Sequence, residues 1–126
     1  AIDLGEHGMI GKLKLTVIES PYAPKDGRTV ADHERYARAC MADSLKRGEA
    51  PIASHLLYTQ PGILDDTIPH ERALGIEAGL QWGALAELSA FYVDCGWSSG
   101  MKAALERAKA EGRSVETRSL TGWAAA

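Results

Sequence analysis

Two serines and a glycine stand directly before an apolar helical pattern late in the chain. The segment reads GWSSGMKAALERAKAEG (96–112), and its apolar residues recur at the spacing of one helical face: Met101, Ala104, Leu105 and Ala108. A serine at the start of a helix caps backbone N–H groups, whereas the same groups left open bind a phosphate or another anion. The sequence leaves both interpretations open for this group of residues: Ser98, Ser99, Gly100 and Met101.

Further polar and aromatic residues follow two other apolar stretches. Ser20, Pro21 and Tyr22 come directly after KLKLTVIE (12–19). Tyr22 is either a packing aromatic or a ligand contact, and its place at the end of a strand favours the contact. Asp65 and Asp66 lie in the loop QPGILDD, where such pairs are often turn residues, but where they could also contact the base or sugar of a nucleotide.

Carboxylates that could act in catalysis are few. Glu77 lies between Gly75 and Gly79 in a helical pattern, so space for a ligand or another backbone could lie beside it. The alternative is a surface glutamate on the polar face of that helix. We select Glu77 as the candidate catalytic carboxylate, and we interpret His55 as a hydrogen-bonded structural histidine.

These residues require a scaffold of alternating strands and helices. Strands are predicted over 12–19, 50–59, 89–96 and 113–120, and helices over 29–49, 67–88 and 97–112. The alternation predicts a Rossmann-like (flavodoxin-like) α/β fold, with a parallel four-stranded sheet of order 2-1-3-4 and helices on both faces. Ligands of such sheets bind at the carboxyl ends of the strands where the strand order reverses, here between the first and third strands.

Length and composition limit the function classes. With 126 residues we expect one nucleotide-binding domain over 12–120, a disordered or cloning-derived segment over 1–11 and a tail over 121–126. The net charge of −3 and scattered basic residues argue against a nucleic-acid partner, and no apolar run suits a membrane span. The phosphate-binding motifs of dinucleotide and P-loop proteins are absent from the sequence, and no metal or other cofactor is expected. We interpret Cys40 and Cys95 as reduced thiols.

Four stretches together resemble the nucleoside 2-deoxyribosyltransferase-like family, between about Lys14 and Leu120. They are VIESPYAP, LKRGEAPIASHLLYTQ, ILDDTIPHERALGIEAG and DCGWSSGM. Similar small uncharacterised members occur in phages and bacteria, so the resemblance implies a cytoplasmic protein of a bacterial or phage-infected host cell. It also implies a Rossmann-like fold and a homo-oligomer, a dimer or higher.

The resemblance further implies a chemistry. Characterised members break or exchange the N-glycosidic bond of deoxynucleosides or nucleoside monophosphates. A glutamate attacks or stabilises the anomeric carbon, an aspartate handles the base, and a first-loop tyrosine orients the sugar. Serine and glycine at helix starts hold the 5′-phosphate. Tyr22 matches that first-loop aromatic, and the start of the last helix matches through Ser99, Gly100 and Met101.

One position departs from the family pattern. Many relatives carry a glutamate three residues after the methionine of the last helix, and here that residue is Ala104. Either Glu77 or Glu19 replaces it, or the protein binds nucleotides without cleaving them, or the chemistry differs. The leading hypothesis is an enzyme acting on a nucleoside or nucleotide glycosidic bond, and the main alternative is a non-catalytic nucleotide-binding or sequestering protein. A third hypothesis is an interaction protein whose glycine-spaced helix 69–88 forms a dimer face.

Overall fold

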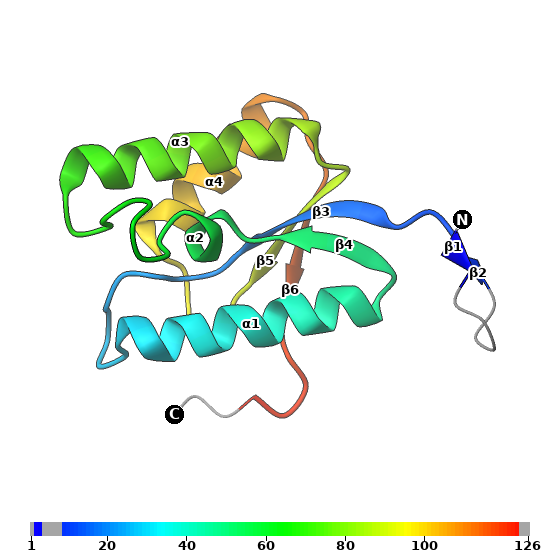
Figure 1. The fold of residues 1–126 in the computed structure, drawn as a ribbon, viewed down its shortest axis with the longest axis horizontal. Coiled ribbons are helices and arrows are strands. Elements are labelled where there is room, and N and C mark those ends of the chain that lie inside the picture. The colour runs from blue at the N-terminus through cyan, green and yellow to red at the C-terminus, as the bar shows by residue number, and fades with distance from the viewer. Residues whose placement is uncertain (1, 4–8, 124–126) are drawn as a thin grey trace.

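The computed structural model describes residues 2–3 and 9–123, and it is an α/β domain built on one parallel sheet (Figure 1). The sheet contains β3 (Lys14–Glu19), β4 (Glu49–Ile52), β5 (Leu88–Tyr92) and β6 (Val115–Arg118), in the order β4-β3-β5-β6. All three strand pairings are parallel. Counted along the chain this is the order 2-1-3-4, so the predicted fold class is confirmed.

Helices cover both faces of the sheet. Helix α1 (Val30–Lys46) packs on one face, whereas α2 (Ser54–Leu57), α3 (Pro69–Leu85) and α4 (Ser99–Ala110) lie on the other (Figure 1). Alternation along the strands divides the core accordingly. Ile18, Ala90 and Tyr92 pack with residues of α1, while Phe91 packs with Met101 of α4.

Two helix boundaries agree with their sequence signals. Thr29 and Asp32 form a capping box at the start of α1, and Gly48 follows its end with a φ of +83°. Helix α3 begins at Pro69, the position where a missing N–H costs a helix nothing.

The predicted strand over 50–59 is correct only in its first part. Strand β4 ends at Ile52, and after Ala53 the chain turns into the short helix α2. Apolar runs of this length do not by themselves distinguish a strand from a short helix, and residues 53–58 contain no β-branched residue. The correction matters because α2 brings Ser54 and His55 to the carboxyl end of the sheet.

Both terminal segments contain more structure than expected. Strand β1 (Ile2–Asp3) pairs antiparallel with β2 (Met9–Ile10), within the segment 1–11 that was expected to be disordered; residues 1 and 4–8 of that segment lie outside the described residues. Within the expected tail, the ring centroid of Trp123 lies 5.1 Å from that of Tyr36. The remaining tail residues, 124–126, also lie outside the described part.

The three glycines of α3 are explained by packing within the chain. A Cβ on Gly79 would lie 2.2 Å from the Ser54 Oγ atom, and one on Gly83 would lie 2.6 Å from a guanidinium nitrogen of Arg113. Gly75 faces Leu64 at 3.2 Å. At these glycines α3 lies close to α2, to Arg113 just before β6, and to the loop that contains Leu64. The glycine spacing is therefore no evidence for a dimer face.

Candidate functional site

A cavity of about 570 Å³, its open mouth included, lies between the carboxyl end of β3, the start of α4 and one side of α3. This is the edge where the strand order reverses, as the sequence predicts. Of the predicted site residues, six line the cavity: Ser20, Tyr22, Asp66, Ser98, Gly100 and Met101. The lining also contains Glu19, which the sequence analysis named only as an alternative to Glu77. The other lining residues were not selected from the sequence: Ser54, His55, Arg72, Ile76, Gly79, Leu80 and Ala104.

Glu19 is the carboxylate of this cavity. It is the last residue of β3, partly buried, and it shares the lining with the apolar side chains of Leu80, Met101 and Ala104. Burial raises the pKa of Glu19 to about 7, and the positive charge of Arg113 only partly opposes that shift. Glu19 accepts no hydrogen bond from any described residue. Its carboxyl group is therefore available to a ligand and titrates near neutral pH.

Ser20 and His55 form a hydrogen-bonded pair in the wall of the cavity. The Ser20 Oγ atom lies 2.7 Å from His55 Nε2. Burial, with a smaller contribution from the charge of His33, lowers the pKa of His55 to about 4. The imidazole is therefore neutral at physiological pH. The Tyr22 ring meets the His55 ring edge-on, with centroids 6.4 Å apart, so these side chains fix one another's positions.

Ser98, at the start of α4, both caps the helix and lines the cavity. Ser98 Oγ accepts a hydrogen bond from the Met101 amide at 3.1 Å, so the capping interpretation is confirmed for Ser98. Within the described part of the chain, the amides of Ser99 and Gly100 donate to no acceptor. Capping thus occupies one of the first N–H groups and leaves two of them open, and Ser98 and Gly100 remain in the cavity lining.

An ion pair stands at the side of the cavity. The guanidinium of Arg72, in the first turn of α3, donates through Nη1 to Asp66 Oδ2. Both side chains are partly buried, with exposed fractions of 31% for Arg72 and 21% for Asp66. One guanidinium nitrogen binds one carboxylate oxygen, so Asp66 Oδ1 and the other two nitrogens of Arg72 keep hydrogen-bonding capacity.

Four predicted site residues lie outside this lining. Glu77 points to Arg107 of α4, which donates to both of its oxygens at 2.9 and 3.0 Å. Asp65 accepts from the backbone and side chain of Thr67 and stabilises a turn. Pro21 is buried beside the site, and Ser99 is exposed at its rim. The structure therefore places Glu19, rather than Glu77, in the cavity.

The sequence contained a signal for one of the lining residues that we did not choose, Glu19. Glu19 is the last residue of a β-branched strand at the predicted switch point, which is where such folds place ligand contacts. Arg72 and His55 carried no such signal. They reach the cavity because α2 and the first turn of α3 fold over the strand ends.

No helix of the described residues is long and apolar enough to cross a membrane, and those residues contain no cluster of side chains suited to hold a metal ion. A family model described as a domain of unknown function (DUF7768) matches residues 14–118. That range contains the whole parallel sheet and every residue of the cavity lining. No curated protein matches the chain.

Proposed function

The chain belongs to the DUF7768 family, and from the cavity of this member we propose that it binds a nucleoside monophosphate and acts on its N-glycosidic bond. The observation that carries the proposal is Glu19, an unpaired carboxyl group inside a partly apolar cavity. The resemblance to nucleoside 2-deoxyribosyltransferase-like proteins supplies the reaction class. We assign the catalytic carboxylate to Glu19 instead of Glu77.

The chemistry suits a single carboxylate of this kind. When the bond between C1′ and the base nitrogen breaks, its electron pair leaves with the base and positive charge develops on the sugar ring. An ionised Glu19 stabilises that charge or forms a bond to C1′, and water or an acceptor base then completes the new bond. With a pKa of about 7, Glu19 is about half ionised at neutral pH.

The start of α4, in the lining of the same cavity, suits the phosphate. The amides of Ser99 and Gly100 lie at the start of a helix, where the partial positive charge favours an anion. We expect Tyr22, whose ring lies edge-on against His55 in the same lining, to contact the sugar. The chemistry as proposed uses no metal or other cofactor.

The experiment is to incubate the protein with a panel of ribo- and deoxyribonucleoside monophosphates and to measure free base by chromatography. We expect base release whose rate rises as the pH passes through about 7, because the ionised form of Glu19 is the active one. Glu19→Gln should lower release at least 100-fold and leave binding within threefold. Glu77→Gln is the matched control, since Glu77 is occupied by Arg107 outside the cavity. Equal losses in the two variants would overturn the assignment.

A second function is favoured by one specific observation. Ala104, which stands where relatives carry a glutamate, lines the same cavity. A protein that lost that carboxylate could retain nucleotide binding without turnover. Tight binding with no base release by the unmodified protein, together with release after Ala104→Glu, would favour this sequestering function over catalysis.

A further inference from the structure

Arg113 lies in the turn between α4 and β6, and its side chain runs beneath α3, where only 11% of it is exposed. Its Nη1 group donates to the Ser89 hydroxyl of β5 at 3.2 Å, and its Nε group donates to Glu111 at 2.7 Å. A Cβ on Gly83 of α3 would lie 2.6 Å from Nη1. The guanidinium group therefore occupies the space that the missing side chain of Gly83 leaves beneath the helix.

Ser89 binds this guanidinium group on the face of the sheet that also carries Glu19. In the parallel pairing of β3 with β5, Val17 lies opposite Ser89, and Glu19 lies opposite Phe91. Side chains two residues apart on a strand point to the same face, and ordinary strand spacing places the Cα atoms of Ser89 and Glu19 about 8 Å apart. The positive charge of Arg113 acts across this distance, since it lowers the pKa of Glu19 against the larger effect of burial.

The other ionisable groups of the cavity lining bring no net charge to Glu19. The Tyr22 phenol and the His55 imidazole are uncharged at neutral pH, and Asp66 and Arg72 neutralise each other in their ion pair. The remaining lining residues are apolar side chains, serines and glycines. Arg113 lies outside the lining, and it is nevertheless the side chain whose charge opposes the effect of burial on Glu19.

Glu111 neutralises Arg113 only in part. The Glu111 side chain is 34% exposed, and it also accepts a hydrogen bond from Arg107 Nε at 3.0 Å. Its negative charge is therefore shared between two arginines and screened by water, whereas the Arg113 guanidinium is mostly shielded from water. A net positive charge remains beneath α3.

We infer that Arg113 is a positioning residue that favours the ionised form of Glu19 from outside the cavity. A cation in a mostly buried region stabilises a carboxylate across several ångströms, and burial without it would keep Glu19 protonated up to a higher pH. The ionised form is the one assigned to act on the glycosidic bond. This inference therefore rests on the proposed function, and it adds a residue that does not touch the substrate.

The direct test is a carbon NMR titration of the Glu19 carboxyl group in the ligand-free protein, with Glu19→Gln to assign the signal. Arg113→Met removes the charge and should raise the titration midpoint by about 0.5 pH unit or more. Arg113→Lys keeps the charge and should restore more than half of that shift. Arg107→Met is the matched control, because it removes a charge that is 35% exposed and paired with Glu77, and the midpoint should not change.

The pH profile of base release separates this role from a merely structural one. In Arg113→Met the rate at pH 7 should fall about twofold or more, because a smaller fraction of Glu19 is ionised. Near pH 9 the rate should approach that of the unmodified protein, because Glu19 is then ionised in both. A structural defect would instead lower the rate by the same factor at both pH values.

An unshifted midpoint in a folded Arg113→Met variant would overturn the inference, and so would an equal shift in Arg107→Met. A shifted midpoint in a protein that releases no base from any nucleotide would overturn the proposed function and leave the effect of Arg113 on Glu19 established. If Arg113→Met does not fold, Arg113→Gln retains a donor for Ser89 without the charge, and the same upward shift is expected.

Discussion

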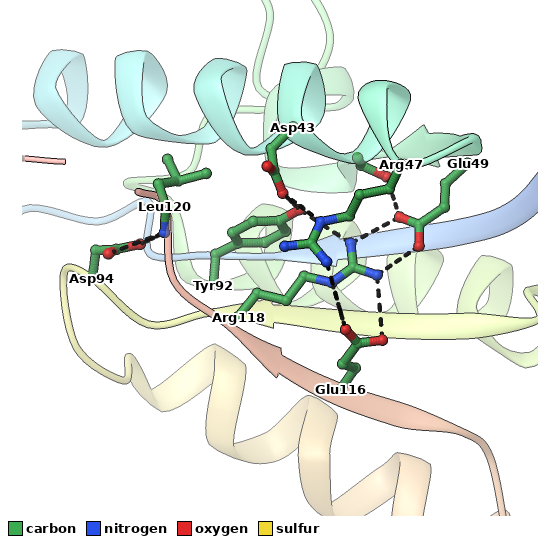
Figure 2. A network of polar contacts seen from close by, with 9 residues as sticks. Asp43, Arg47, Glu49, Tyr92, Asp94, Glu116, Arg118 and Leu120 are labelled. Carbon is green, nitrogen blue, oxygen red and sulfur yellow. Dashed lines mark hydrogen bonds and ion pairs between the residues drawn. The ribbon is translucent and has the colours of Figure 1, made fainter. Parts of the chain in front are cut away.

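Glu49 and Glu19 are two carboxylates on opposite faces of one sheet, and their surroundings differ completely. On the α1 face, Glu49 is 7% exposed and accepts from both terminal nitrogens of Arg118 and from the Ser44 hydroxyl (Figure 2). The hydrogen bonds from Arg118 are the main cause that holds the pKa of Glu49 below its usual value. On the α3 face, Glu19 has no such partner and its pKa is raised.

The difference separates a carboxylate that the chain pairs internally from one that the chain leaves unpaired beside a cavity. Arg118, at the centre of Figure 2, also donates to the Tyr92 hydroxyl at 3.1 Å and to Glu116 at 3.1 Å, while Tyr92 donates to Asp43. This network joins α1, β4, β5 and β6, and within it the chain neutralises the buried charges of Glu49 and Arg118 by pairing them with each other. A buried charge that the chain itself neutralises holds elements together, whereas one that the chain leaves unpaired beside a cavity can act on a substrate.

The largest effect is expected from breaking the pair on the α1 face. Arg118→Met leaves the Glu49 carboxylate buried with only Ser44 as partner, and the free energy of unfolding should fall by about 3–5 kcal/mol. Urea unfolding at pH 7 measures the loss. The pKa of Glu49 lies below its unfolded value, so the stability that this group contributes is present above pH 4.5 and is lost as the pH falls further. The difference in unfolding free energy between the unmodified protein and Arg118→Met should therefore become smaller below pH 4.5.

Arg47→Met is the control for this experiment. Arg47 pairs with Asp43 at 2.8 Å, but 42% of its side chain is exposed. Exposed ion pairs contribute about 1 kcal/mol or less, so this variant should stay close to the unmodified protein. Losses of the same size for both arginines would show that the buried network is no more important than the surface charges around it.

The next largest expected effect is an increase in the free energy of unfolding. Glu19→Gln removes a carboxyl group whose pKa rises from 4.5 to about 7 on folding. A raised pKa costs the folded protein stability as the pH increases from 4.5 to 7, because the unfolded chain ionises first. The variant should be more stable than the unmodified protein by up to about 3 kcal/mol at pH 8, and equally stable at pH 4.

Thermal or urea unfolding at the two pH values decides this prediction. A stabilisation that is the same at pH 4 and pH 8 would show that Glu19 does not titrate between them. Loss of base release together with increased stability would be the behaviour expected of a reactive group that strains the fold around it.

The sequence was sufficient for the sheet and for the edge of the sheet at which the cavity lies. Periodicity, turn residues and the right-handed crossover rule fix the alternation and the order of the strands, and the reversal of that order locates the cavity. They do not determine which side of α3 meets the sheet. This helix carries apolar residues on every side, with Leu74 60% and Leu85 75% exposed, so its pattern could not show that Glu77 faces Arg107 instead of the cavity.

The burial of Glu19 was equally hidden from the sequence. Its place at the end of β3 was predicted, but its pKa is raised by burial, and the cavity that it lines is also lined by Leu80, Met101 and Ala104 of two later helices. The close approach of α3 to the rest of the chain occurs in turn at its glycines. Such contacts are properties of the folded chain and have no local signature beyond the glycines themselves.

The smallest effect concerns the close packing of α2 against α3 on the cavity face. Gly79→Ala places a Cβ 2.2 Å from Ser54 Oγ and 2.7 Å from Ser54 Cβ, so α2 must move. We expect a net loss of about 1–2 kcal/mol, since overpacking outweighs the gain of about 1 kcal/mol in helix propensity. Gly75→Ala is the matched comparison: its Cβ meets only the flexible end of Leu64 at 3.2 Å, and the propensity gain should make that variant slightly more stable. Ser54→Gly combined with Gly79→Ala should recover most of the loss, because both clashing atoms are then absent. Equal stabilisation of both alanine variants in urea unfolding would contradict the close contact between Gly79 of α3 and Ser54 of α2.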